Sequence, residues 1–288
     1  MGPPLTIPTP VVNAIHDVVK ETRRGSWWCL KRLVEGLEEA CRLNMLAEVD
    51  REVLAKALES SNPSMAAIVN LADAVRKATD VCSAVYRVGS YVAEARTRLV
   101  KNAREFVRPR IVTISFSSAV ADTISSYMNR VELVWILESQ PGGEGADLYR
   151  YLVSKGVNAK LVPDTMAAQA VEESDIVLVG ADAIDMNGCV VNKIGTRMLA
   201  ILAHTLGKPV VVLAEAIKIS PYRDCRDLAQ AVHKRFKLGD IEVELPIFEA
   251  VEPEYIMYIV TDLGIAIPVP ISIEGMYREL LRAITSSS

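Results

Sequence analysis

The stretch DIVLVGADAIDMNGCVVNKIGT, residues 175–196, joins an apolar strand to an acidic residue and then to a loop rich in glycine and asparagine. The carboxyl ends of parallel strands line the ligand crevice of an open α/β sheet, so Asp182 is expected at such a crevice. Lys193 and Thr196 follow in the same segment. A single aspartate here can equally cap a turn, with the lysine in solvent. The density of turn-forming residues favours a ligand site, because it is typical of a backbone that approaches something closely.

Composition limits the classes of protein to which the chain can belong. It has 288 residues, half of them hydrophobic, which is enough for a large core and two compact domains. No apolar run approaches the roughly 20 residues of a membrane span, and the first residues lack the order of a signal peptide. The formal net charge of −4 disfavours a direct nucleic-acid partner. We therefore expect a cytoplasmic protein with neither a membrane nor a nucleic-acid partner.

The cysteines and histidines are scattered along the chain. Five cysteines are widely spaced without a CxxC pair, and none of the three histidines stands in an HxH or HExxH arrangement. Such spacing indicates neither a zinc site nor a disulfide framework. The sequence therefore predicts buried reduced thiols and no metal ligands.

The hydrophobic period changes near Arg104. Before it, apolar residues recur every three or four positions, which is typical of amphipathic helices. A new helix is expected near Ser64, because Pro63 can occupy a first helical turn. After Arg104, helical stretches separate short apolar runs. These patterns predict a helical domain over residues 1–104 and an α/β domain over residues 105–288.

The second domain is predicted to be a Rossmann-like, doubly wound parallel sheet. Its strands are expected at residues 111–115, 131–138, 159–162, 175–181 and 209–214. Strands alternate with helices, which indicates parallel pairing, and apolar runs on both faces indicate a sheet covered on both sides. No GxGxxG follows the first strand, so a nicotinamide or flavin cofactor is disfavoured, and we predict no cofactor.

Two further polar loops are expected at the same edge of the sheet. After the first strand, Ser115, Ser117 and Ser118 stand where a helix begins, and free amides at a helix N-terminus can bind phosphate. Each serine alone can also be an ordinary helix cap. The second loop is ESQPGGEG, residues 138–145, whose glycines predict a tight turn. Three polar loops at one edge favour a binding site.

Four segments carry a resemblance to a known family: IVTISFSSAV (111–120), ESQPGGEG (138–145), GADAIDMNGCVVNKIGT (180–196) and VTDLGIAIPVPIS (260–272). In this order they resemble the family that joins the regulatory subunits of translation initiation factor 2B to two sugar-phosphate isomerases. Those isomerases act on methylthioribose 1-phosphate and on ribose 1,5-bisphosphate. The resemblance covers essentially the whole chain and implies a helical N-terminal domain followed by a Rossmann-like domain that usually dimerises.

The isomerase branch of the family implies an acid–base pair of one cysteine and one aspartate. Asp182 matches the aspartate, while Asn192 and Lys193 match residues that approach the substrate. Arg24 and Gly25 match an Arg-Gly turn that contributes to phosphate binding. These positions agree with the isomerases.

Other positions depart from the isomerase pattern. Ser115 stands at the cysteine position, and serine forms no thiolate near neutral pH. Asn62 and Gln140 replace two arginines suited to binding phosphate, and Glu144 stands where the isomerases tend to have glutamine. These departures disfavour turnover of a bisphosphate.

The regulatory branch accounts for the same departures, since its alpha-type subunits tend to read ESQP and TDLG, both present here. The resemblance therefore implies a subunit that binds initiation factor 2, a small phosphorylated sugar or nucleotide, or both, without turnover. The alternative is a degenerate aldose–ketose isomerase that uses Asp182 with Ser115, or with Cys189 reaching in. A scaffold with a vestigial pocket is a third alternative. A homodimer or larger homo-oligomer is expected. The expected ligand-binding residues are Arg24, Gly25, Ser115, Ser117, Gln140, Asn192 and Lys193.

Overall fold

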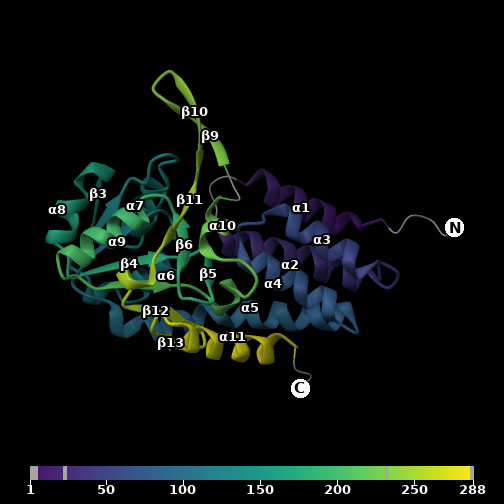
Figure 1. The fold of residues 1–288 in the computed structure, drawn as a ribbon. Helices are drawn as coiled ribbons and strands as arrows, with labels where there is room; N and C mark the ends of the chain where they lie inside the picture. Colours follow the sequence, from purple (N-terminus) through teal and green to yellow (C-terminus); the bar gives the residue numbers. More distant parts are fainter. Residues whose placement is uncertain (1–5, 22–24, 231–232, 286–288) are drawn as a thin grey trace.

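The computed structural model describes residues 6–21, 25–230 and 233–285 and has an α/β fold (Figure 1). Its described part contains eleven α-helices and a seven-stranded central sheet. The first four helices lie at one end of the molecule, the central sheet lies at the other, and the fifth helix extends from the helices to the sheet. No helix in these ranges is long and apolar enough to cross a membrane.

The N-terminal helices bury the apolar stripes that the sequence predicts. They are α1 (Thr9–Lys20), α2 (Ser26–Arg42), α3 (Arg51–Ser61), α4 (Ala66–Lys77) and α5 (Val81–Ala103). Leu30, Leu33 and Leu37 of α2 are fully buried at helical spacing. The helix expected near Ser64 is α4, which begins two residues later. Asp80 caps α5 by accepting hydrogen bonds from the backbone N–H groups of Cys82 and Ser83.

The central sheet confirms the five strands expected from the sequence. They are β1 (Arg110–Ile114), β2 (Leu133–Leu137), β3 (Ala159–Val162), β4 (Ile176–Gly180) and β7 (Val210–Leu213). The strand order is β13-β12-β7-β4-β1-β2-β3, with β12 (Tyr258–Thr261) parallel to β7 and β13 (Gly264–Ala266) antiparallel at the edge. The six parallel strands have the order of a doubly wound nucleotide-binding fold.

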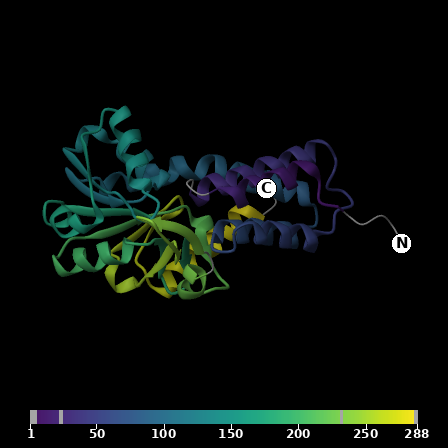
Figure 2. The ribbon, with the colours of Figure 1, turned by 90° about the horizontal axis from the view of Figure 1, so that it is seen from above.

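Alternate residues of each strand enter two different cores. On β1, Ile111 packs into a core with α6 (Ser118–Ser126) and α7 (Glu144–Ser154). Its neighbour Val112 packs into the opposite core with α8 (Ala167–Glu172) and α9 (Thr196–Thr205). The layers are visible from above (Figure 2). Because side chains alternate along a strand, a sheet covered on both faces requires apolar residues at every position.

A smaller sheet and a projecting hairpin complete the fold, and neither follows from the sequence patterns. The small sheet has the order β11-β6-β5-β8. Its strands are β5 (Ala183–Asp185), β6 (Val190–Lys193), β8 (Ile219–Ser220) and β11 (Phe248–Val251). The hairpin of β9 (His233–Leu238) and β10 (Ile241–Pro246) extends away from the body (Figure 1). The remaining helices are α10 (Cys225–Gln230) and α11 (Pro270–Thr285).

A buried ion network joins the helices to the sheet. Glu215 is fully buried and lies 2.5 Å from the Arg96 guanidinium and 3.2 Å from Lys218 Nζ. Burial disfavours the ionised carboxyl, but the charges of Lys218 and Arg96 outweigh it and lower the pKa of Glu215. One hydrophobic core continues from the helices into the sheet. The division of the chain into two domains at residue 104 stays a prediction.

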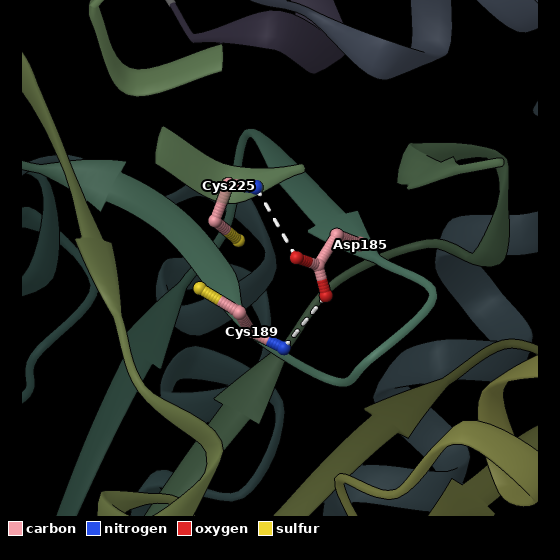
Figure 3. A group of neighbouring side chains, drawn as sticks. All are labelled: Asp185, Cys189 and Cys225. Atoms are coloured by element: carbon pink, nitrogen blue, oxygen red, sulfur yellow. Dashed lines mark hydrogen bonds between the residues drawn. The ribbon is translucent and has the colours of Figure 1, made fainter. Parts of the chain in front are cut away.

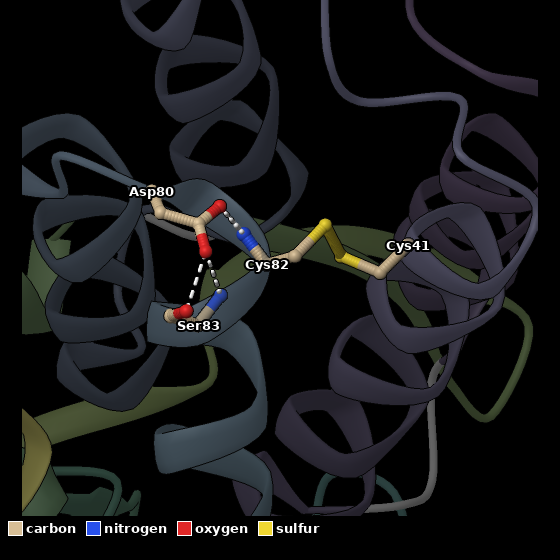
Figure 4. The surroundings of a disulfide bond; sticks show 4 residues. All are labelled: Cys41, Asp80, Cys82 and Ser83. Atoms are coloured by element: carbon tan, nitrogen blue, oxygen red, sulfur yellow. Dashed lines mark hydrogen bonds between the residues drawn. A yellow bond between two sulfur atoms is a disulfide. The ribbon is translucent and has the colours of Figure 1, made fainter.

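The expectation of reduced thiols was wrong for two of the five cysteines. Cys41, near the end of α2, forms a disulfide with Cys82, at the start of α5 (Figure 4). The two residues are 41 positions apart in the sequence, but packing of α2 against α5 brings their Cα atoms to 5.6 Å. This separation lies in the range that a disulfide spans. Spacing could not reveal the pair, because helix packing creates the proximity.

Candidate functional site

A polar pocket lies at the carboxyl ends of β1 and β4, where the sequence places it. The loops after these strands, the end of β6 and the beginning of α2 all contribute to its lining. Of the predicted site residues, the structure brings six together in this pocket: Gly25, Ser115, Ser117, Asp182, Asn192 and Lys193. Arg24 lies outside the described residues. The convergence follows from the parallel sheet, because all parallel strands end on the same edge.

Asp182 and Ser115 reach the pocket from neighbouring strands. Asp182 follows β4, and its backbone N–H donates to the Val191 carbonyl at 2.8 Å. Ser115 follows β1 with a φ of 66°, a left-handed conformation that is uncommon for a non-glycine residue. Its backbone N–H donates to Ser139 Oγ at 2.6 Å, which holds the turn. The loops after β1 and β2 are thus joined directly beneath the pocket.

Ser117 combines a structural role with a place in the pocket. It is the N-cap of α6, and its Oγ accepts a hydrogen bond from the Val120 N–H at 3.4 Å. Gly180, the last residue of β4, leaves room for this serine, since a Cβ on Gly180 would lie 2.4 Å from Ser117 Oγ. Ser117 can therefore cap α6 and line the pocket at the same time.

Lys193 is held by an acidic partner inside the pocket. Its Nζ lies 2.8 Å from Glu144 Oε1 and also donates to the Pro141 carbonyl. The lysine and glutamate side chains are 7% and 15% exposed, so water screens their attraction only weakly. Beside it, Asn192 donates to Thr196 Oγ1 at 2.9 Å, which ties β6 to the start of α9. A ligand anion must compete with Glu144 for the lysine.

The pocket is also lined by two lysines that the sequence patterns did not indicate. Lys218 follows β7, and its Nζ donates to the Ala181 carbonyl at 2.8 Å. The rule that strand ends carry ligands would have found Lys218, because it stands just beyond a predicted strand. Lys234 comes from β9, and burial lowers the pKa of its ammonium. Nothing in the sequence pattern places the base of that hairpin beside the pocket.

The beginning of α2 presents an open set of hydrogen-bonding groups to the pocket. Gly25 is the N-cap residue without a side chain, so no side-chain oxygen covers the first amides of this 17-residue helix. Ser26 is 1% exposed, and its Oγ has no hydrogen-bond partner within the described ranges. Asn62 Oδ1 is likewise buried without a partner there. Buried polar atoms of this kind normally have partners, so both atoms are suited to a ligand.

The comparison with known families is consistent with this architecture. The model of the initiation factor 2 subunit family matches residues 22–268. The chain belongs to the initiation factor 2 subunit family.

The relatives of this family member include proteins named as translation initiation factor subunits and proteins named as isomerases. It is 29% identical to a putative translation initiation factor eIF-2B subunit 2-like protein of Pyrococcus horikoshii, over 91% of this chain and 98% of the relative. It is 31% identical to a ribose 1,5-bisphosphate isomerase of Archaeoglobus fulgidus, over 62% of this chain and 67% of the relative.

Solved structures show the same fold. The crystal structure of the Pyrococcus horikoshii translation initiation factor eIF-2B has a TM-score of 0.81 and 28% identity, over 91% of this chain and 98% of that one. The 5-methylthioribose 1-phosphate isomerase of the same organism has a TM-score of 0.70 and 21% identity, over 93% and 88%. The second likeness shows the fold alone.

Gln140 lies at an exposed position in the loop after β2. Its side chain is exposed and is absent from the described lining. Its backbone N–H donates to Asp164 at 2.7 Å, and the same carboxylate accepts from the Ser139 N–H at 2.8 Å. Asp164 therefore positions the loop after β2, and Gln140 as a ligand contact stays a prediction.

The three free cysteines lie outside the described lining of the pocket. Cys189 lies beside Cys225 and Asp185 at the turn end of the β5–β6 hairpin, whereas Asp182 lies at the open end of that hairpin. Burial raises the pKa of the Cys225 thiol. Cys29 is 1% exposed, and burial together with the charge of Asp182 raises the pKa of its thiol to about 12. At neutral pH, Cys29 is therefore a protonated thiol and a poor acid–base partner.

Proposed function

We propose that this chain is an initiation factor 2B-like regulatory subunit whose pocket binds a small phosphorylated sugar or nucleotide without converting it. One observation carries the proposal. Asp182 and Ser115 line the pocket together, and no thiol is among the described residues that line it. Isomerisation between neighbouring sugar carbons needs an acid and a base of suitable pKa. A serine hydroxyl is a much weaker acid than a cysteine thiol, so the pair lacks one functional partner.

The ligand class follows from the groups that face the pocket. Three lysines and the open start of α2 provide positive charge and N–H donors, which favour an anion with several acceptor oxygens. The unpartnered Ser26 hydroxyl adds a donor. Asp182 can accept hydrogen bonds from sugar hydroxyls, and the Asn192 amide can both accept and donate them. A phosphate on a polyhydroxy group combines both requirements.

Glu144 limits the phosphate groups that the pocket accepts. It neutralises Lys193 at 2.8 Å, and Glu21 adds a further carboxylate to the lining. Two phosphates in this space would face the carboxylates at short range, where repulsion is costly. We infer that a monophosphate is preferred to a bisphosphate.

Phosphorus NMR on the intact protein tests this function. Ribose 1,5-bisphosphate, methylthioribose 1-phosphate and adenosine monophosphate are added separately to the wild type. We expect broadened or shifted resonances without conversion, and the largest effect with a monophosphate. Lys193→Met should abolish the shift because it removes one of the three lysines that line the pocket, whereas Lys56→Met removes an exposed surface lysine of α3 and should leave the shift intact.

Three outcomes distinguish binding without turnover from catalysis and from a vestigial pocket. Conversion of either sugar phosphate to its ketose by the wild type would overturn the proposal and make Asp182 catalytic without a thiol. Conversion by Ser115→Cys alone would support the proposal, because it identifies the thiol as the missing group. The absence of any shift with all three phosphates would refute the ligand and favour a scaffold with a vestigial pocket.

We also propose that the chain acts in the cytoplasm as a homodimer or larger oligomer and binds initiation factor 2. Support comes from the names of its relatives and from a tetrameric eIF2B β2δ2 complex of C. thermophilum with the same fold, at a TM-score of 0.69 and 16% identity. Near the edge strand β13, Met257, Ile267 and Ile271 are exposed by 51%, 51% and 82%, which suits a contact surface. A light-scattering mass of 31.5 kDa would refute the oligomer, and failure to retain initiation factor 2 in a pull-down would refute that partner.

A further inference from the structure

Two cysteines and one aspartate converge beneath the β5–β6 turn (Figure 3). Asp185 ends β5, Cys189 precedes β6 and Cys225 begins α10. One ligand atom from each residue lies within 4.8 Å of the other two. The two sulfur atoms and the carboxylate point toward one another between the hairpin and the helix.

Backbone hydrogen bonds hold this arrangement in place. Asp185 Oδ1 accepts from the N–H groups of Asn187 at 2.8 Å and Cys189 at 3.0 Å, and Oδ2 accepts from the Cys225 N–H at 3.2 Å. Each cysteine is thus anchored by its own amide to the same carboxylate. The position of the three ligand atoms follows from the backbone of two separate chain segments.

The carboxylate is buried without a cation. Asp185 is 4% exposed and forms no ion pair with any residue in the described ranges. A carboxylate offers about four lone-pair positions, and the three amides occupy three of them. One position on Oδ2 therefore remains available toward the two sulfurs. Buried charges in proteins are normally paired or bound to a metal.

The chemistry of the donors selects the cation. Two cysteine sulfurs and one carboxylate oxygen suit a borderline-soft ion, whereas calcium and magnesium require oxygen ligands throughout. Zinc is usually four-coordinate, and three protein ligands leave one position for water. Cys189 is only half-buried, which gives solvent access to that position, while Cys225 is 2% exposed.

We propose that Asp185, Cys189 and Cys225 form a binding site for Zn²⁺, distinct from the phosphate pocket. The two thiol protons go to solvent when the sulfurs coordinate the ion. The bound ion links the β5–β6 hairpin to α10. Because the same hairpin follows Asp182 and ends in Asn192 and Lys193, the ion stabilises the loop that shapes the pocket.

Zinc content of the full-length protein tests the site. The protein is reduced, freed of metal with a chelator, incubated with one equivalent of Zn²⁺ and dialysed, and its zinc is measured by mass spectrometry. We expect about one zinc per chain in the wild type and at least a tenfold weaker retention in Cys189→Ser and Asp185→Asn. Cobalt in place of zinc should produce a thiolate-to-metal charge-transfer absorption that Cys189→Ser loses.

Two matched controls separate this site from the other thiols. Cys29→Ser removes a buried free cysteine elsewhere, and Cys82→Ser removes one thiol of the other cysteine pair. Both should retain zinc like the wild type. Cys189 is the preferred ligand to replace because it is half-buried, and circular dichroism checks that the variant folds. If Cys189→Ser does not fold, the cobalt spectrum of the wild type decides alone.

Several results would overturn the proposal. These are a reduced wild type that retains no zinc, a Cys189→Ser variant that retains as much zinc as the wild type, and a cobalt spectrum without thiolate absorption. A Cys189–Cys225 disulfide in the purified protein, together with failure of the reduced form to bind zinc, would identify the pair as a redox couple and refute the metal site.

Discussion

Replacement of Cys82 by serine should destabilise the oxidised protein strongly. The Cys41–Cys82 disulfide closes a loop of 41 residues that contains α3 and α4. Closure of a loop of this length removes enough unfolded-state entropy to stabilise the fold by about 4 kcal/mol. Both sulfurs lie in a half-buried part of the bundle, so the serine hydroxyl itself costs little. We expect Cys82→Ser to lower the free energy of unfolding by about 4 kcal/mol.

Guanidinium denaturation of the full chain, followed by circular dichroism, measures this change. The wild type and Cys82→Ser are compared without and with a phosphine reductant. The difference should be large in oxidised samples and should nearly vanish when the wild type is reduced, because both chains then lack the covalent loop. Equal stability of the two oxidised proteins, or a difference that persists in reductant, would refute the entropic reasoning.

Three further substitutions test the packing and the charges. Arg96→Met leaves the buried carboxylate of Glu215 with one cation and should cost about 3–5 kcal/mol in chemical denaturation. Arg150→Met, which removes an exposed arginine that pairs with Asp147 on the surface of α7, should cost about 1 kcal/mol or less. Gly145→Ala places a Cβ 2.0 Å from a β2 carbonyl oxygen and should cost at least about 1–3 kcal/mol. Gly275→Ala has open space in α11 and should stabilise the protein by up to about 1 kcal/mol. Identical melting temperatures for the two variants would contradict this prediction. Hydrogen bonds from Arg110 lower the pKa of Asp175 below its ordinary value of 3.8. The ion pair therefore stabilises the fold fully above pH 3.8, and this stabilisation is lost as the pH falls through the pKa of the folded state. On acidification through that range, the melting temperature of Asp175→Asn should therefore fall less than that of the wild type. Parallel plots of melting temperature against pH for the two proteins would contradict this prediction.

The candidate site was predictable to the extent that it follows from strand ends. Ser115, Asp182 and Lys193 were placed together because parallel strands finish on one edge, and all three line the pocket. Lys218 obeys the same rule, because it stands beyond the strand predicted at residues 209–214. Lys234 lies at the base of a hairpin, and only long-range packing brings that base beside the pocket.

Pairing between distant side chains was not predictable. The sequence shows Glu144 where the isomerases tend to have glutamine, but its ion pair with Lys193 arises from the fold of the loop after β2. The cysteines illustrate the same limit, because spacing along the chain says nothing about Cys41 meeting Cys82 or Cys189 meeting Cys225.

By itself, the sequence determined the helical first part, the parallel sheet and the edge of the sheet that holds the pocket. Hydrophobic period and strand-end chemistry are local properties, so they can be read along the chain. Only the tertiary structure decided which lysines reach the pocket, which carboxylates neutralise them and which thiols form pairs. These contacts join segments far apart in sequence, and their geometry depends on how helices and strands pack, which no local pattern encodes.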